Sequence, residues 1–418
     1  MTKITKVHAR QVFDSRGNPT VEAEVILENN IKASAIVPSG ASTGTFEAHE
    51  LRDKAEYLFK GKSVLEAVRN INFPIHGKLK NLNIDDQEKI DKILIELDGT
   101  ENKTKLGANS ILAVSIAVNK AASINKNENY SNLDHNVFLP LPLMNIINGG
   151  AHADNALRIQ EFMIRPEKPI HFMGAIEHCF LVIQSLKKIL ISKKLSVNVG
   201  DEGGFAPLIN SNEEALDLIV DAISLAKLRP GHHVSICLDV AANELLEENG
   251  KYSLQSERSF NVDEAISYYK KIISKYPIKS IEDPFGENDW DAWTKLTSEV
   301  GKNVQIVGDD LFVTNEKRLK KGIDSKSANA ILIKPNQIGT VTETLKVIDL
   351  AQKNNFATII SHRSGDSEDT FIADLAVKTN SSQIKTGSLS RSERVAKYNR
   401  LLKIEEELGN KAKMNKIH

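Results

Sequence analysis

Three acidic residues in the second half of the chain could together hold a cation. Asp239, Glu282 and Asp309 each follow a short aliphatic run. If the ends of these runs converge, three carboxylates would repel one another in one cavity unless a cation lay among them. Oxygen ligands without histidine or cysteine favour Mg²⁺ or a similar hard ion over zinc. The alternative is that each carboxylate pairs with a neighbouring lysine or arginine.

Basic residues close the next aliphatic runs. Lys334 follows Ala330–Ile333, where burial of an ammonium group is costly without a partner. Taken alone, a lysine at this place is more often a strand-end residue that reaches solvent. Arg363 followed by Ser364 suits a phosphate, and Lys385 adds a further positive charge. The set predicts a pocket for an anionic substrate.

Further polar groups come from earlier in the chain. Glu202 lies in the turn Gly200–Gly204, where glycines leave room for a substrate. His152 and the pair Gln160-Glu161 stand near the predicted first strands of the second domain. Each of these alone is more often a hydrogen-bonded structural group.

The chemistry that suits the whole set is removal of a proton next to a carboxylate. Divalent cations bound to that carboxylate would spread the charge of the resulting enolate. Positive charge near a lysine disfavours its ammonium form, so we expect a depressed lysine pKa and a lysine base. An opposing carboxylic acid would then protonate a leaving group.

Repeated strand and helix patterns would bring these residues together. From Glu282 onward the residues that end the runs recur about every 25 positions, which is the length of one strand–loop–helix unit. We therefore expect a β/α barrel over residues 137–418, with its strand ends meeting at one mouth. The runs expected to be strands are 196–199, 234–238, 278–281, 304–307, 330–333, 357–360 and 382–384.

The first 136 residues follow a different pattern. Alternating runs at 21–27 and 31–37 flank Glu28-Asn29-Asn30 and predict an antiparallel hairpin, while 88–97 and 110–122 have helical spacing. This predicts a smaller α+β domain over residues 1–136. The loop Pro38–Gly44 is either plain linker or a mobile lid over an anion. The asparagine-rich stretch Asn125–Asn136 marks the predicted boundary.

Bulk composition narrows the class of protein. With 54 basic and 55 acidic residues, the net charge of −1 gives no global field for nucleic acid. No apolar run approaches membrane-spanning length, so we expect no membrane insertion. Cys179 and Cys237 both lie in apolar segments, which is typical of a reducing compartment. These features predict a cytoplasmic protein, with an additional surface or secreted pool as an alternative.

At these residues the sequence resembles the enolase family across nearly its whole length, with the matching motifs in family order. The motifs are Asp14-Ser-Arg-Gly-Asn-Pro-Thr-Val-Glu, Val37-Pro-Ser-Gly-Ala-Ser-Thr-Gly, Leu106-Gly-Ala-Asn-Ser-Ile-Leu, Asn148-Gly-Gly-Ala-His-Ala, Gln160-Glu-Phe-Met-Ile, Gly200-Asp-Glu-Gly-Gly, Ser280-Ile-Glu-Asp-Pro-Phe, Gly308-Asp-Asp-Leu, Lys334-Pro-Asn-Gln-Ile-Gly-Thr, Ser361-His-Arg-Ser-Gly and Ile384-Lys-Thr-Gly.

The resemblance implies a barrel of the enolase type, reversible dehydration of 2-phospho-D-glycerate to phosphoenolpyruvate, two Mg²⁺ per active site, and a homodimer or a larger ring of dimers. It implies that Lys334 takes the C2 proton and that Glu202 protonates the departing C3 hydroxyl. The implied metal ligands are Asp239, Glu282 and Asp309 for the first ion and Ser42, in the lid loop, for the second. The implied substrate contacts are Arg363 and Ser364 to phosphate, Lys385 to carboxylate, and His152, Gln160, Glu161 and His362 as the remaining wall.

Two other functions are compatible with the fold that the resemblance implies. A related barrel enzyme would act on a non-phosphorylated acid, but the Arg363-Ser364 pair and the lid loop count against it. A binding protein such as an adhesin or plasminogen binder would keep the fold without turnover, and the intact set of site residues counts against that. Departures from the family pattern at Lys54-Ala55 and Asn125–Asn136 concern the packing of the small domain and the subunit contacts.

Overall fold

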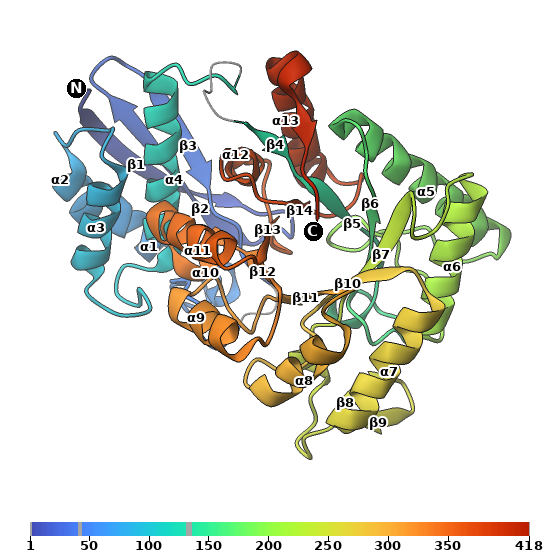
Figure 1. The fold of residues 1–418 in the computed structure, drawn as a ribbon. Coiled ribbons are helices and arrows are strands. Elements are labelled where there is room, and N and C mark those ends of the chain that lie inside the picture. Colours follow the sequence, from blue (N-terminus) through green and yellow to red (C-terminus); the bar gives the residue numbers. More distant parts are fainter. Residues whose placement is uncertain (1, 41–43, 131–135, 418) are drawn as a thin grey trace.

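A computed structural model describes residues 2–40, 44–130 and 136–417, and Figure 1 shows the fold. The N-terminal part is built on an antiparallel sheet of β1 (Ile4–Phe13), β2 (Pro19–Leu27) and β3 (Lys32–Ile36), in that order. Asn30 closes the turn between β2 and β3 with a positive φ of 66°, a backbone region that asparagine tolerates well. The predicted hairpin is therefore confirmed.

Helices cover one face of this sheet. The 18-residue α4 (Ala108–Asn125) packs on β2 and β3, and its apolar side chains from Ile111 to Val118 are buried. Helix α3 (Gln87–Asp98) packs against α4. The remaining elements of this part are η1 (Phe59–Gly61), α1 (Leu65–Asn70), η2 (Ile71–Ile75) and α2 (His76–Leu79).

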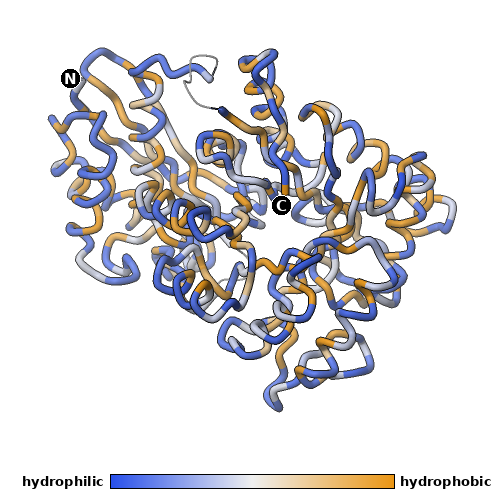
Figure 2. The backbone as a smooth tube through the Cα atoms, in the orientation of Figure 1, coloured by the Kyte–Doolittle hydropathy of each residue, from blue (hydrophilic) through white to orange (hydrophobic). Residues whose placement is uncertain are grey.

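The second part is a closed barrel of eight strands. Around the barrel, β10 (Ile278–Glu282) is followed by β11 (Gln305–Gly308), β12 (Ala330–Ile333), β13 (Ala357–Ser361), β14 (Gln383–Lys385), β5 (Leu141–Asn148), β6 (Glu161–Pro166) and β7 (Val234–Asp239). The interior holds a tight cluster of buried side chains, which are Leu143, Met163, Cys237, Val307, Ala330, Leu332 and Ile359. In Figure 2 the strands of both parts carry much of the hydrophobic colour.

One strand of the barrel runs against the others. β6 is antiparallel to both β5 and β7, whereas the other barrel pairs are parallel. Glu161, the first residue of β6, is in register with Asp239, the last residue of β7. A reversed strand therefore brings its beginning to the mouth at which its neighbours end.

Helices form the outer wall of the barrel (Figure 1). They are α5 (Phe172–Ser192), α6 (Asn212–Leu225), α7 (Val262–Lys275), α8 (Trp290–Val300), α9 (Glu316–Ser325), α11 (Val341–Lys353), α12 (Phe371–Lys378) and α13 (Ser392–Leu408). Short elements complete the part, namely β4 (Phe138–Leu139), η4 (Gly150–His152), η5 (Ala242–Leu245), β8 (Tyr252–Gln255), β9 (Arg258–Phe260), α10 (Pro335–Ile338), η6 (Gly409–Lys411) and β15 (Lys413–Met414).

The predicted two-part fold is confirmed, with one error among the strands. Residues 196–199 are not a strand: only Val199 forms an isolated bridge, to Phe205. The alternation of aliphatic residues suggested a strand, but this segment lies outside the barrel sheet. It leads into the turn that contains Glu202. The boundary at residue 136 stays a prediction. In the described ranges, no helix combines the length and apolar character that a bilayer crossing requires.

The two parts are joined by specific hydrogen bonds. Asp91 of α3 accepts hydrogen bonds from the backbone N–H (2.9 Å) and hydroxyl (2.6 Å) of Thr342, in the first turn of barrel helix α11. Ser115 of α4 accepts another from the Val341 N–H, at 3.0 Å. Ser39, in the loop that begins at Pro38, exchanges two backbone hydrogen bonds with Gly365 of the barrel. The N-terminal part thus caps a barrel helix and pairs with the loop after β13.

Candidate active site

The predicted site residues converge on one pocket at the barrel mouth. All of those that the structure describes line it, except Glu282, which reaches the same cluster through Lys385. Ser42 lies outside the described residues. The lining consists of Gly40, His152, Gln160, Glu161, Glu202, Asp239, Ala241, Asp283, Asp309, Asp310, Lys334, Ser361, His362, Arg363, Ser364 and Lys385.

Lys385 is surrounded by carboxylates. Its Nζ lies 2.7 Å from Asp239, 2.9 Å from Glu282 and 3.2 Å from Glu161, and all four residues are buried. Burial opposes the charge on Lys385, but the carboxylates outweigh it and raise the pKa of Lys385 well above its usual value. Burial and the nearby Asp239 raise the pKa of Glu282 well above the usual carboxyl range. One ammonium group therefore does not balance this cluster.

A second acidic group lies beside the first. Asp283, Asp309 and Asp310 each offer a carboxylate oxygen within 4.8 Å of the others. Asp283 accepts hydrogen bonds from the backbone N–H groups of Asp309 and Asp310, both at 2.9 Å. Burial, followed by the charge on Asp309, raises the pKa of Asp310 to about 7. These crowded hard oxygen donors fit Mg²⁺, and they share Asp309 with the predicted set of Asp239, Glu282 and Asp309.

Lys334 stands where β12 meets the short helix α10, and 14% of its side chain is exposed. Its Nζ forms an ion pair with the Asp309 carboxylate. Burial acts to lower the pKa of Lys334, but Asp309 outweighs burial and the pKa is raised. The predicted depressed pKa concerns Lys334 with divalent cations bound beside it, so it stays a prediction; without them, the pairing with Asp309 decides the direction.

The side chains of Gln337 and Thr314 hold Lys334 and Asp309 in place. Gln337 donates to Asp309 at 2.9 Å and accepts from the Thr314 hydroxyl at 2.8 Å. That hydroxyl in turn accepts the backbone N–H of Lys334, at 2.9 Å. Gly339 ends α10 with a φ of 102°, and a Cβ there would lie 2.7 Å from the Lys103 side chain. The segment that carries Lys334 is therefore closely fitted on both sides.

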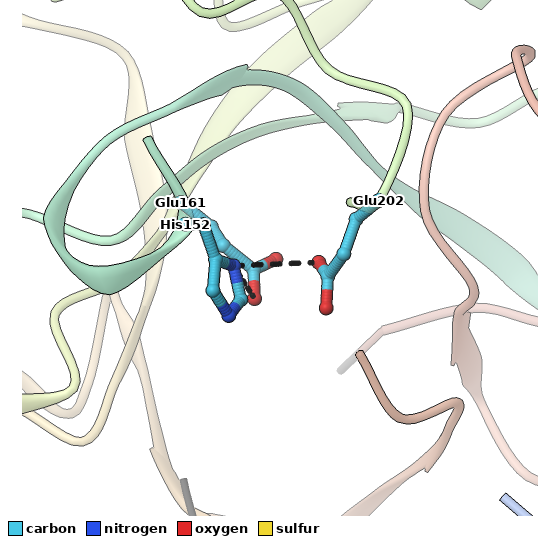
Figure 3. A group of neighbouring side chains, drawn as sticks. All are labelled: His152, Glu161 and Glu202. Atoms are coloured by element: carbon cyan, nitrogen blue, oxygen red, sulfur yellow. Dashed lines mark ion pairs between the residues drawn. The ribbon is translucent and has the colours of Figure 1, made fainter. Parts of the chain in front are cut away.

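The opposite wall holds His152, Glu161 and Glu202, which point toward one another in Figure 3. His152 Nδ1 lies 3.9 Å from Glu161 and 4.0 Å from Glu202. Burial, followed by the charge on Glu202, raises the pKa of Glu161 well above its usual value. Burial and repulsion between two carboxyls this close favour a proton on Glu161 over one on Glu202.

Glu202 is the more readily ionised member of this pair. Burial opposes its ionisation, but His362, His152 and Arg394 outweigh burial and lower the pKa of Glu202. Burial also lowers the pKa of His362, to about 4, so this ring is neutral at neutral pH. His362 therefore faces Glu202 without a charge of its own, with Nε2 3.5 Å from the carboxylate.

Arg363 is held by a residue that the sequence analysis missed. Glu47, which follows the lid loop, accepts from both terminal nitrogens of Arg363, at 2.9 and 3.2 Å. The Asn336 side chain accepts a further bond from Arg363 at 3.1 Å. A single glutamate in a polar loop belongs to no recognisable sequence pattern. Its role becomes apparent only in the structure, through its contact with Arg363.

Arg394 is the second residue missed, and it is fully buried. It contacts the His362 ring and the backbone of the loop after β13. The spacing of apolar residues around Arg394 on α13 indicates only that this face of the helix is buried. The sequence shows that an arginine lies on that face, but it does not show which groups the arginine contacts.

This fold and mouth define a class of barrel enzymes that remove a proton next to a carboxylate, with carboxylates for a divalent cation and basic groups for an anion. Residues 136–418 match the family model of the enolase C-terminal TIM barrel domain, and residues 4–132 match that of the enolase N-terminal domain. The chain is 63% identical over 421 residues to the enolase of Pelagibacter ubique (strain HTCC1062), covering all of both chains. It belongs to the enolase family, and membership of this family implies Mg²⁺.

Proposed function

We propose that this mouth carries out the enolase reaction, the reversible dehydration of 2-phospho-D-glycerate to phosphoenolpyruvate, with Lys334 as base and Glu202 as acid. The observation that supports these roles most is their placement. β12, which Lys334 directly follows, stands four strands from β6 in the closed order of eight, and β6 begins with Glu161 beside Glu202. Base and acid thus act from opposite walls, as removal of a proton and a hydroxyl from adjacent carbons requires.

Lys334 takes the C2 proton at its Nζ, for which its ion pair with Asp309 must be relieved. We assign Asp239, Glu282 and Asp309 to the first of two Mg²⁺ ions and Ser42 to the second. When bound, Mg²⁺ supplies the positive charge that stabilises the enolate and favours a neutral lysine. Gln337 keeps the Asp309 carboxylate oriented while this pairing changes.

The substrate is held by its two anionic ends. Arg363 and Ser364 bind the phosphate, and Lys385 binds the carboxylate. Arg363 presents a planar fork that suits phosphate, and its pairing with Glu47 keeps that fork in one orientation. His152, Gln160, Glu161 and His362 form the rest of the wall.

The leaving hydroxyl receives its proton from Glu202. The free site favours an ionised Glu202, so Glu202 must gain a proton before it can act as the acid, and Glu161, whose pKa is raised, can supply that proton. Asn145 donates to Glu202 at 3.3 Å and fixes the carboxyl that faces the pocket.

The proposed mechanism is tested by replacing the base. Lys334→Ala should reduce the Mg²⁺-dependent rise in phosphoenolpyruvate absorbance by about 10²- to 10⁴-fold, which is the usual contribution of a positioned base. Chelation with EDTA should abolish the wild-type rate, and added Mg²⁺ should restore it. Lys353→Ala, which removes an exposed lysine paired only with Asp349 on the surface, is the control.

An undiminished rate in Lys334→Ala would remove Lys334 from the mechanism. A screen in which the wild type prefers a non-phosphorylated acid would replace the proposed substrate.

We further propose that the enzyme acts in the cytoplasm as a homodimer. Phe13, Tyr57 and Phe59 expose 57%, 88% and 50% of their surfaces on the N-terminal part, and the Phe13 and Phe59 rings are 5.7 Å apart. A patch of this kind suits an interface with a second copy.

Light scattering should give twice the chain mass of 46.3 kDa, and Tyr57→Glu combined with Phe59→Glu should shift the protein to monomer. A wild-type protein that is monomeric at micromolar concentration would contradict this proposal.

A further inference from the structure

Arg394, near the start of α13, links the two walls of the mouth. Its terminal nitrogens donate to the backbone carbonyls of Arg363 at 2.6 Å, Ser364 at 2.7 Å and Asp201 at 3.1 Å. The same guanidinium lies 2.6 Å from Nδ1 of His362. A single fully buried side chain therefore contacts the loop after β13, the turn before Glu202 and an imidazole of the pocket.

The chemistry of this contact fixes where the His362 proton lies. A guanidinium carries only N–H donors, so Nδ1 of His362 must accept with its lone pair. A neutral imidazole holds one proton, which then belongs on Nε2. An imidazolium would instead bring a second N–H against the guanidinium. The charged groups that face this ring are Arg394, Glu202 and Asp366, and Asp366 is 3.8 Å from Arg394.

The other end of the ring is directed at the reacting side of the pocket. Nε2 of His362 lies 3.5 Å from a Glu202 oxygen, and the ring is buried. Among the described residues Nε2 has no hydrogen-bond partner of ordinary geometry. A buried donor in this position is available to Glu202 or to a group bound beside it.

We infer that Arg394 is a positioning residue that holds His362 in the neutral tautomer with its proton on Nε2, so that an N–H donor faces Glu202. In the opposite tautomer a bare nitrogen would face the carboxylate that Glu202 becomes once it has released its proton. The catalytic consequence rests on the proposed role of Glu202, whereas the tautomer does not.

The chain offers a matched control one turn along the same helix. Lys397 is also buried on α13, and it also binds the loop after β13, at Asp366 (2.9 Å) and at the carbonyl of Ser367. In the described part of the chain, Lys397 forms no hydrogen bond or ion pair with His362. Lys397→Met therefore removes a buried cation and loop contacts of the same kind without removing the donor to Nδ1.

The tautomer can be read directly by ¹⁵N NMR of the wild-type protein labelled at histidine, with the His362 signals assigned by their loss in His362→Gln. At neutral pH we expect Nδ1 at the shift of an unprotonated nitrogen and Nε2 at that of an N–H. The opposite tautomer, an even mixture or an imidazolium would overturn the inference. This measurement needs no variant of Arg394, and it stands even if no phosphoenolpyruvate is formed.

The role of Arg394 is then tested by substitution. Arg394→Met should mix the tautomers and lower kcat by about 10- to 100-fold, the usual cost of losing a group that orients an active-site histidine, with a smaller change in KM. Arg394→Lys should restore a donor to Nδ1 and much of kcat, and Lys397→Met should keep the wild-type tautomer. A folded Arg394→Met protein with low kcat and an unchanged tautomer would overturn the inference.

Discussion

At the scale of single residues, the mouth is a set of buried charges in which each lysine already has an acidic partner. Lys334 pairs with Asp309, and Lys385 contacts Asp239, Glu282 and Glu161. The sequence left two alternatives open: the carboxylates pair with lysines, or they hold a cation. Both can be true of this site. Burial first, and repulsion from the neighbouring Asp239 and Asp309 second, raise the pKa values of Glu282 and Asp310, although lysines lie beside both groups.

The depressed pKa of His362 predicts how stability depends on pH. The folded-state pKa of about 4 lies below the usual 6.5, so the unfolded chain binds more protons between these values. Stability should therefore be lost as pH falls from 6.5 to about 4, by up to about 3 kcal/mol from this residue. Urea unfolding at pH 7 and pH 5 measures the loss. His362→Gln should reduce it and His8→Gln should not; an equal loss in all three proteins would contradict the prediction.

At the scale of elements, the segment from β12 through α10 to α11 depends on the N-terminal part. Lys334 stands at the start of α10, Gly339 ends that helix, and α11 follows at Val341. Asp91 and Ser115 of the N-terminal part supply acceptors for the first N–H groups of α11, which have no acceptor within their own helix. The position of Lys334, the proposed base, is thus set partly from outside the barrel.

Removal of this interdomain cap should destabilise the docked molecule. Asp91 is buried and accepts four hydrogen bonds, from Gln87, Ser115 and, twice, Thr342. Asp91→Ala leaves these donors without a partner and should cost about 2 kcal/mol or more, seen as a lower Tm and a lower urea midpoint. Glu88→Ala, at an exposed position of the same helix, is the control. A melting temperature equal to that of Glu88→Ala would contradict the prediction.

The sequence predicted most of the elements and the strand-end residues because both follow from periodicity. Short aliphatic runs at a regular spacing identify the strands that lead to Asp239, Glu282 and Lys334. The residues at the barrel mouth could therefore be predicted from the sequence. The direction of β6 could not be predicted, because a short apolar run reads alike in either direction. Glu47 and Arg394 were missed since each acts through a partner more than 30 residues away in the chain.

At the scale of the whole molecule, the pocket belongs to the barrel but its surroundings belong to both parts. Gly40 lines the pocket, Glu47 holds Arg363, and Ser39 pairs with Gly365 beside the proposed phosphate contacts. Ion pairs of Lys103 with Glu343 and of Lys120 with Asp369 extend the same seam. The N-terminal part is therefore a component of the active site as well as a neighbour of it.

Ser39 of the N-terminal part pairs through its backbone with Gly365 of the barrel, beside the pocket. Separation of the two parts should therefore abolish turnover, so the rate of turnover measures whether they are docked. Hydrogen bonds, ion pairs and apolar packing of α4 against α10 and α11 hold the seam, whereas the barrel is held by its own closed ring of strands, so we expect denaturant to part the seam first. In a urea series we expect turnover to vanish at a lower concentration than the far-ultraviolet circular dichroism of the barrel. Coincident loss of both signals would mean that the two parts unfold as one cooperative unit.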